Sequence, residues 1–460
     1  MPGQAITMDR IRDATRGSIT KELWQFMLPV LWTNLLQSLT GSVNAAWVGH
    51  LLGERPLAAI LNANSVVGLL FATTFGITWA STILVGQRSG AGDFHAARQI
   101  VCTSAKFVFA LSVIVSLTGI PLSEHMLEWM GTPTGSLQLA DPYLRMILLS
   151  LPLAYLFMFS LYMMRATGES RTATRLLILS ITLDVILNPI LIFGAGIVPR
   201  LGIVGSAWAT LISQGAPLVV FLSCLYASKH PLRPHRSELL RFGVDKVVIT
   251  DLVRKGAPVC LQVLVITLGG SAIVALVNQF GVETAASYAA VNAVWAYIQM
   301  PSFAVGMAVT LMAAQSVGAK DTTRVKAITR AGLMFSVFMT GSGTLLVHLL
   351  KRQAYELLLP SGSAAVDIAV HISWIASWSL IFSGMSMVFF GVMRANGSTM
   401  PPLLIEIAQL LGIRFPFALA LARTMGADAI WWSFSFSALL TTLVTAYYYY
   451  YGRWKFPVAV

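Results

Sequence analysis

The sequence predicts an all-α, polytopic membrane protein with twelve spanning helices in two six-helix lobes. Of its 460 residues, 56 % are hydrophobic and only 11 % are charged, and the mean hydropathy is +0.73. A soluble domain usually carries about a quarter of charged residues. Because this deficit runs along the whole chain, it indicates a chain that crosses the bilayer many times.

Twelve apolar windows approach or exceed the roughly twenty residues that a spanning helix needs. In the first half they lie at 24–48, 57–85, 99–121, 143–164, 173–196 and 202–228. In the second half they lie at 251–279, 284–312, 327–350, 366–393, 399–422 and 427–451. The first window is too long for a signal-peptide core and lacks a small-residue cleavage site, so we predict that it is a retained span.

The longest polar connection, "SKHPLRPHRSELLRFGVDK" at 228–246, separates the two sets of windows. We therefore predict an N-terminal lobe over 1–228, which begins with a cytoplasmic N-terminus at 1–23. A cytoplasmic linker is predicted over 229–250, and a C-terminal lobe over 251–460.

Lys and Arg residues between the predicted spans fall mostly on one side of the bilayer, and this side holds both termini. The positive-inside rule identifies that side as the cytoplasm. The protein is therefore expected in the cell inner (plasma) membrane, with both termini cytoplasmic. The formal net charge of +12 follows from this asymmetry, so we expect the lipid bilayer as a partner and no nucleic acid.

The two halves of the sequence repeat one another. Three pairs of segments align, namely "GQRSGAGDFHAAR" (86–98) with "AQSVGAKDTTRVK" (314–326), "MRATG" (164–168) with "MRANG" (393–397), and "GIVGSAWATLIS" (202–213) with "GADAIWWSFSFS" (426–437). Six spans is an even number, so both copies have the same orientation. A pseudo-twofold axis along the membrane normal is therefore expected, as in transporters with parallel repeats.

Motifs of the common enzyme classes are absent from the sequence. It contains no GxxxxGK[ST], HExxH or GxSxG pattern and no paired-cysteine motif. The 3 cysteines lie in apolar segments, and the 7 histidines are scattered. We therefore expect no metal and no cofactor, and predict a secondary transporter that uses an ion gradient and is not an enzyme.

Several segments together resemble one transporter family. They are "LPVLWTNLLQSLTGSVNAAWVGHLLG", "GQRSGAGDFHAAR", "MRATGESRTATRLLI", "LNPILIFGAGIVPRLGIVGSAWATLIS", "QSVGAKD" and "GVMRANGSTMPPLL". The chain resembles the multidrug and toxic compound extrusion (MATE) family, bacterial type, over essentially its whole length. The resemblance implies two lobes around a central cavity. It also implies antiport of organic cations or amphipathic compounds against H+ or Na+.

The sequence departs from the family pattern at the acids that couple transport to an ion. Proton-coupled bacterial members typically carry an acid late in the first span, where this chain has Asn44. Another branch carries an acid in the seventh span, where "QVLVITLGGSAIVALV" holds none. In the fifth span, relatives often show Asn followed four residues later by Asp. Here the order is Asp184 and then Asn188.

Asp184 is the only carboxylate within the predicted spans of the first half. A charge at mid-membrane is costly, so such a residue normally faces a partner or a wet cavity. Ser180, Asp184 and Asn188 lie on one helix face, because they are spaced by four residues. We predict that Asp184 and Asn188 form the proton or cation site. The alternative is a static hydrogen bond between helices.

Polar residues also share one face of the first span. These residues are Asn34, Gln37 and Asn44. Because two polar faces exposed to lipid are unfavourable, we expect this face to meet Asp184 in the N-terminal lobe. Asn44 then belongs to the coupling site, and Asn34, Gln37 and Ser180 to the substrate cavity. Helix–helix hydrogen bonding is the alternative role for these residues.

Glu406 is a possible second acid, within the eleventh predicted span. Its alternative role is pairing with Arg414 or with a neighbouring helix.

Tyr288, Asn292, Trp295 and Gln299 follow one face of the eighth span and are candidates for the substrate cavity. Aromatic faces bind lipophilic cations, although aromatic side chains also pack in cores. Pro29, in the first span, is a candidate hinge, because an interior proline removes one helix hydrogen bond. A static kink is the alternative.

Together these observations predict a multidrug/H+ antiporter, with Na+ as a possible coupling ion, that alternates access between two lobes. We expect it to act as a monomer on small drug-like molecules. A lipid or lipid-linked oligosaccharide flippase of a related fold is one alternative. It is disfavoured because nearly all Lys and Arg lie in predicted loops. A passive channel-like membrane protein is the second alternative.

Overall fold

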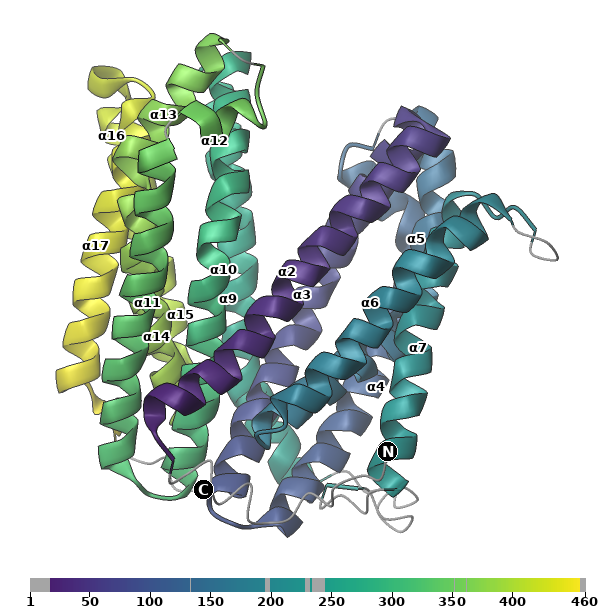
Figure 1. Ribbon diagram of the computed structural model, residues 1–460, viewed down its shortest axis with the longest axis vertical. Helices are drawn as coiled ribbons and strands as arrows, with labels where there is room; N and C mark the ends of the chain where they lie inside the picture. Colours follow the sequence, from purple (N-terminus) through teal and green to yellow (C-terminus); the bar gives the residue numbers. More distant parts are fainter. Residues whose placement is uncertain are drawn as a thin grey trace. The chain divides into compact units, whose positions relative to one another are not determined.

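The computed structural model describes residues 17–132, 134–194, 199–227, 232–233, 245–350, 352–360 and 362–455. These residues are helical almost throughout and include no β-strand (Figure 1). Most of the predicted N-terminus at 1–23 and of the predicted linker at 229–250 lies outside the described residues.

Long helices make up both halves of the chain. The first half holds α2 (Ile19–Leu52), α3 (Glu54–Gly90), α4 (Phe94–Trp129), α5 (Thr134–Ala166), α6 (Ser170–Phe193) and α7 (Ile203–Ala227). The second half holds α9 (Lys246–Asn278), α10 (Val282–Gly318), α11 (Thr322–Leu350), α12 (Arg352–Glu356), α13 (Ala364–Ala376), α14 (Trp378–Ala395), α15 (Met400–Ile407), the π-helix η1 (Ala408–Arg414), α16 (Phe415–Met425), α17 (Asp428–Tyr451) and the short η2 (Arg453–Lys455).

Eleven helices among the described residues are long and apolar enough to cross a membrane. Helix α2, with 34 residues, corresponds to the first predicted span and is additional to these eleven. The predicted tenth span at 366–393 is divided into α13 and α14 at Ser377.

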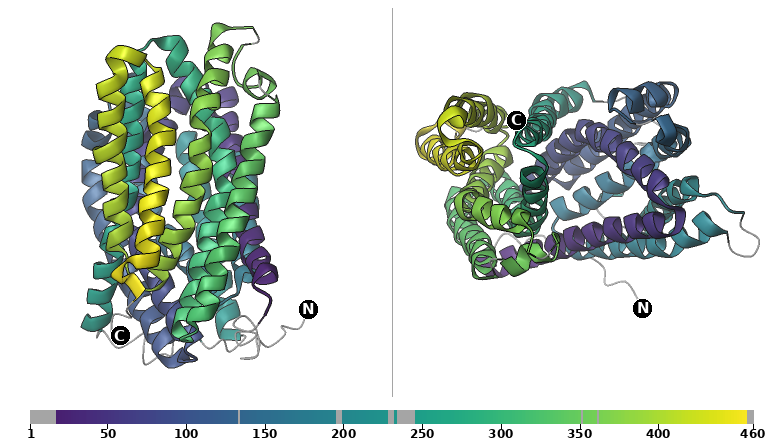
Figure 2. Two further views of the ribbon diagram at one scale, coloured as in Figure 1. Left: turned by 90° about the vertical axis from the view of Figure 1, so that its left-hand side faces the viewer. Right: turned by 90° about the horizontal axis from the view of Figure 1, so that it is seen from above.

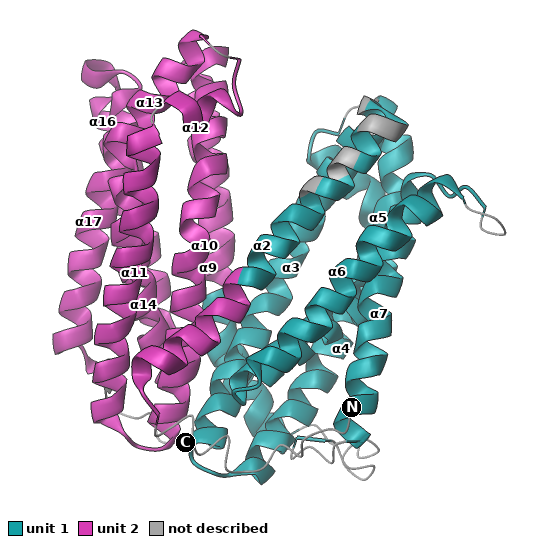
Figure 3. Cartoon of the chain, in the orientation of Figure 1, with its two compact units in different colours: residues 1–14, 32–260 teal, residues 15–31, 261–460 magenta. Residues whose placement is uncertain are grey.

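The chain folds into two compact units (Figure 3). Unit 1 holds Trp32–Cys260, and unit 2 holds Thr15–Leu31 together with Leu261–Val460. Within unit 1, α3, α4 and α5 pack against one another, and α7 packs on α5 and α6. Within unit 2, α10, α11, α14 and α17 run side by side (Figure 2).

Helices α2 and α9 each contribute residues to both units. In each helix the division follows two residues after an interior proline, which is Pro29 in α2 and Pro258 in α9. The two prolines are equivalent positions of the repeat, because their offset is that of "MRATG" and "MRANG". A proline without an N–H removes one helix hydrogen bond, so both divisions lie beside weakened helix turns.

The helix starts that follow the second span of each half have the same cap. The Asp93 carboxylate accepts a hydrogen bond from the Ala96 backbone N–H at 2.9 Å at the start of α4. The Asp321 carboxylate accepts one from the Arg324 N–H at 2.8 Å at the start of α11. Since the two aspartates align in the sequence repeat, the turns confirm the alignment at the level of the backbone.

Replacing Lys320 by Gly is expected to stabilise the protein by about 0.5–1 kcal/mol. Lys320 has φ of 59°, a left-handed conformation, and its repeat counterpart is Gly92 with φ of 78°. A side chain makes this conformation unfavourable, whereas glycine adopts it readily. Thermal unfolding of the purified protein in detergent measures the change. The reverse substitution, Gly92→Lys, is expected to lower the unfolding temperature.

Helices α3 and the first part of α9 are in very close contact inside unit 1. A Cβ atom on Gly76 would clash with the Cys260 Sγ atom and would lie 2.5 Å from the Gly256 carbonyl oxygen. The Cys260 thiol also donates to the Thr73 carbonyl oxygen at 3.1 Å. Glycine at this position therefore lets the two backbones approach.

Gly76→Ala is accordingly expected to destabilise unit 1 by about 1–3 kcal/mol, because a backbone atom blocks the added methyl group and the helices must separate. Gly68→Ala, in the same helix, is the matched control, because nothing lies within 4 Å of the added Cβ. Thermal unfolding of both variants compares them. An equal response of the two would contradict the close contact.

Candidate functional site

Asp184 of α6 is buried in unit 1 and is bound by uncharged groups. The Asn44 amide of α2 donates to its Oδ2 atom at 2.7 Å, and the Ser213 hydroxyl of α7 donates to its Oδ1 atom at 3.4 Å. The Asp184 side chain is 8 % exposed. No Lys, Arg or His among the described residues forms an ion pair with it. The carboxyl group therefore has partners from two neighbouring helices but no counter-charge.

The polar residues of α6 lie on its buried face. Ser180, Asp184 and Asn188 are all buried, as their spacing predicts. The Asn188 amide donates to the Asp184 backbone carbonyl at 3.1 Å. Within the described residues, the side-chain oxygens of Asn44 and Asn188 are buried without a hydrogen-bond partner. Because buried polar atoms normally have a partner, these two oxygens are positions where a water or ion gains a contact.

A cavity of about 270 Å³ adjoins this group. Asn44 and Gly41 of α2, Asn64 of α3 and Tyr143 of α5 are among its lining residues. The Tyr143 hydroxyl donates to the Asn64 side-chain oxygen at 3.3 Å. Since one water occupies about 30 Å³ of liquid, the cavity has room for several waters or a small organic group. Asn44 both lines the cavity and binds Asp184, so it connects the two.

The other candidates of the first span lie apart from Asp184. Asn34 is half-buried and Gln37 is exposed, and neither lines the cavity. Ser213 and Tyr143 were not predicted from the sequence. Single Ser and Tyr residues in apolar helices are common, so the sequence offers little to distinguish these two from core residues.

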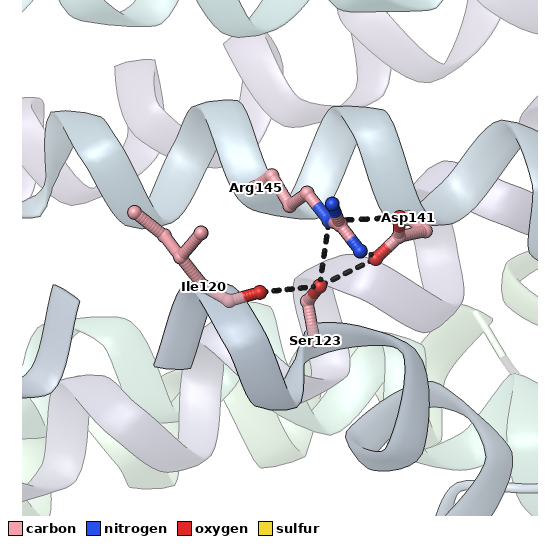
Figure 4. Close-up of polar contacts among 4 residues, drawn as sticks. All are labelled: Ile120, Ser123, Asp141 and Arg145. Carbon is pink, nitrogen blue, oxygen red and sulfur yellow. Dashed lines mark hydrogen bonds and ion pairs between the residues drawn. The ribbon is translucent and has the colours of Figure 1, made fainter. Parts of the chain in front are cut away.

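A second carboxylate of unit 1, Asp141, lies within a helix because α5 begins at Thr134, earlier than the predicted span. Figure 4 shows Asp141 beside Arg145 and Ser123. The Arg145 Nε atom lies 2.9 Å from its Oδ2 atom, and the Ser123 hydroxyl of α4 donates to its Oδ1 atom. The Ser123 Oγ atom also lies 2.9 Å from the Ile120 carbonyl oxygen, which is an alternative acceptor for its one proton. Asp141 is therefore paired with a cation and joins α4 to α5.

In unit 2, Glu406 lies among positive charges. It interacts electrostatically with Arg414 and Arg394, and its carboxyl group approaches Gln262. The Arg394 guanidinium donates to the Gln262 side-chain oxygen at 2.6 Å. Glu406 therefore lies near both arginines without an ion pair to either, and its role as a second acid stays a prediction.

The aromatic candidates of α10 lie in the core of unit 2. Tyr288 stacks on Trp431 with ring centroids 5.5 Å apart, and Trp295 packs edge-on against Phe434 at 5.7 Å. Tyr288 and Trp295 are both buried. Asn292 is exposed and Gln299 is half-buried. Packing therefore accounts for the two aromatic residues in this structure.

Comparison with known proteins places the chain in a family. The MatE family model matches residues 29–190 and 258–420. The chain belongs to the MatE family. It is 32 % identical to "Probable multidrug resistance protein YoeA" of Bacillus subtilis (strain 168), over 89 % of this chain and 88 % of that protein. It is 24 % identical to "Multidrug export protein MepA" of Staphylococcus aureus (strain bovine RF122 / ET3-1), over 93 % of each.

The fold of this MatE protein also matches a solved structure, "Crystal structure of MATE in the bent conformation", with a TM-score of 0.88 and 18 % identity. The match covers 98 % of this chain and 97 % of the other. These matches confirm the predicted all-α fold class with twelve membrane helices in two lobes. The protein is a multi-pass membrane transporter of a multidrug efflux family, and the prediction that it is not an enzyme is confirmed.

Proposed function

We propose that this MatE protein exports organic cations or amphipathic compounds by antiport against protons, and that Asp184 carries the coupling proton. One observation carries the proposal. Asp184 is a buried carboxyl group that has only uncharged hydrogen-bond donors and adjoins a cavity through Asn44. A charged carboxyl group in a membrane helix is costly, so one without a fixed counter-charge is the group that we expect to bind the coupling proton.

The hydrogen bonds of Asp184 explain how a proton alters the protein. The ionised carboxylate accepts from Asn44 and Ser213 with one oxygen each. A proton bound to Oδ2 removes the negative charge and makes that oxygen a weaker acceptor, so the hydrogen bond from the Asn44 N–H and the link between α2 and α6 weaken. If drug binds better to one arrangement of α2 and the proton to the other, then drug weakens proton binding and the proton weakens drug binding. Antiport requires this linkage.

Pro29 is the proposed hinge of this change. It lies near the end of the part of α2 that belongs to unit 2, and Asn44 lies further along α2 in unit 1. An interior proline lowers the cost of bending a helix at that turn.

The remaining features of the proposal follow from membership of the family and from the sequence. The transporter acts in the inner membrane with cytoplasmic termini and functions as a monomer. It uses H+ as its coupling ion and needs no cofactor. Na+ is the competing coupling ion, because the unpaired oxygens of Asn44 and Asn188 are also suitable cation ligands.

Transport in reconstituted vesicles tests this function. The protein is inserted into vesicles, and ethidium flux is measured while the pH and Na+ gradients are varied independently. We expect flux to follow the pH gradient and to be unaffected by Na+. Dependence on the Na+ gradient alone would replace the proton by sodium. Ethidium flux that depends on neither gradient would indicate a passive pathway and contradict antiport.

A further inference from the structure

The sequence repeat places opposite charges at corresponding positions of the two units. In unit 1 the Ser213 hydroxyl of α7 donates to Asp184 at 3.4 Å. In unit 2 the Arg414 Nε atom, at the end of η1, donates to the Ser437 hydroxyl of α17 at 3.1 Å. Ser213 and Ser437 are the last residues of the aligned segments "GIVGSAWATLIS" and "GADAIWWSFSFS". Each serine therefore holds a charged side chain of the preceding helix, an acid in unit 1 and a cation in unit 2.

A second pair of contacts fixes the correspondence. The Arg165 guanidinium donates to the Thr33 hydroxyl at 3.3 Å in unit 1, and Arg394 donates to Gln262 at 2.6 Å in unit 2. Arg165 aligns with Arg394, and Thr33 aligns with Gln262, at the same sequence offset. The segment from Arg394 to Arg414 is one residue longer than the segment from Arg165 to Asp184. The π-helix η1 accommodates this extra residue, because its turn is wider than an α-helical turn.

Arg414 is only partly bound by the protein. Its guanidinium carbon lies 4.5 Å from the centre of the Phe434 ring, and its Nε atom is bound to Ser437. Its two terminal nitrogens form no hydrogen bond with any described residue. Glu406 interacts with it electrostatically but does not approach within the 4.0 Å of an ion pair. One face and one edge of the guanidinium are thus fixed, and the terminal N–H groups have no hydrogen-bond acceptor among the described residues.

The surrounding charges do not cancel. The cluster contains two arginines, Arg394 and Arg414, and one carboxylate, Glu406. The Arg394 Nε atom is buried and has no hydrogen-bond partner among the described residues. Two cations with one anion leave an excess positive charge inside a membrane lobe, where an unpaired charge is costly. A bound anion relieves that cost, and a guanidinium with free terminal N–H groups matches a carboxylate in two parallel hydrogen bonds.

From these contacts we infer that unit 2 holds an anion site at Arg414, which takes the carboxylate of an amphipathic ligand. The inference adds anionic and zwitterionic amphipaths to the cargo proposed above. It rests on that proposed function only for their transport, since binding at Arg414 requires no proton coupling. The anionic group can belong to a dissolved carboxylate or to an anionic lipid, and the test separates these two sources.

Binding of 2-naphthoate to the full-length protein in nanodiscs of neutral phosphatidylcholine tests the site. The matched cation, 2-naphthylmethylammonium, has the same apolar body and the opposite charge. We expect Arg414→Gln to weaken 2-naphthoate binding by about tenfold or more, since charge-assisted hydrogen bonds are lost, and to leave binding of the cation unchanged. Arg423→Gln, at an exposed arginine of α16, is the control and should change neither.

Glu406→Gln gives a second, independent result. Glu406 competes with a ligand for the same guanidinium, so its neutralisation should strengthen 2-naphthoate binding. If Arg414→Gln does not purify in a folded form, this variant decides the question. Unchanged or weaker binding in Glu406→Gln would overturn the proposal, as would equal losses for the anion and the cation in Arg414→Gln. Absence of 2-naphthoate binding to the wild type would also overturn it.

Nanodiscs that contain phosphatidylglycerol separate the two sources of anion. If lipid reaches Arg414, 2-naphthoate binding to the wild type weakens in these nanodiscs, whereas binding to Arg414→Gln does not respond to the lipid. If the site takes dissolved carboxylates alone, the lipid has no effect on either protein. Ethidium transport driven by a pH gradient is measured on the same preparations, so a failure of the anion site is distinguished from a failure of proton-coupled export.

Discussion

Asp184→Asn is expected to abolish substrate-dependent proton movement while leaving a folded protein. The amide has nearly the shape of the carboxylate and keeps an oxygen acceptor for Asn44 or Ser213, but it takes up no proton at physiological pH. No cation among the described residues pairs with Asp184, so removing its charge leaves no unpaired partner. The cost in stability should therefore be small, at about 1 kcal/mol or less.

A pH-sensitive dye enclosed in the reconstituted vesicles measures this effect, as the proton release that follows addition of ethidium. Asp141→Asn is the matched control, because it removes the other carboxylate of α5 and α6 but one that is already paired with Arg145. We expect the control to move protons at close to the wild-type rate. Undiminished proton movement in Asp184→Asn would show that another group couples transport.

The sequence was sufficient to identify the polar face of α6, because an acid and an asparagine four residues apart in an apolar helix have few explanations. It also predicted that this face meets the first span. It did not predict which residue of that span reaches Asp184. Asn34, Gln37 and Asn44 share a face, but only Asn44 forms the hydrogen bond. A face spans several turns, and the depth at which two helices cross is decided by packing that the pattern does not encode.

The buried arginines were beyond sequence reasoning for a different reason. Counting charges between apolar windows assigned Arg165 and Arg394 to loops, yet Arg165 is 5 % exposed and lies at the end of α5. Its guanidinium lies 5.6 Å from the Tyr162 ring, and that of Arg394 lies 5.9 Å from the Phe390 ring. Aromatic rings one turn away thus cover both arginines. Each unit therefore holds an arginine that a count of loop charges misses.

The division of α2 and α9 between the units was also not visible in the sequence. Pro29 and Pro258 mark the two positions, but an interior proline is compatible with a static kink. The distinguishing information is tertiary, since the residues before Pro29 pack with unit 2. Trp24 of α2 packs edge-on against Phe335 of α11, with ring centroids 5.3 Å apart. One continuous helix therefore carries contacts to each unit on the two sides of a proline.

The second large effect is expected at the ion pair that holds the start of α2 within unit 2. The Arg324 guanidinium of α11 lies 2.6 Å from the Glu22 carboxylate, and the two side chains are only 11 % and 9 % exposed. Replacing one partner of a buried pair leaves the other charge without compensation. Glu22→Leu and Arg324→Met are each expected to lower the free energy of unfolding by about 3 kcal/mol.

The double variant Glu22→Leu with Arg324→Met is expected to recover most of that loss, because neither charge then remains buried alone. Thermal unfolding of the wild type, the two single variants and the double variant completes a double-mutant cycle. Arg330→Met, at an exposed arginine of the same helix, is the control. Additive losses would show that the pair is not coupled.

The same variants test the hinge, since Glu22 and Asn44 anchor α2 on opposite sides of Pro29. If bending at Pro29 transmits protonation of Asp184, the double variant should regain stability while proton-coupled ethidium transport stays slow.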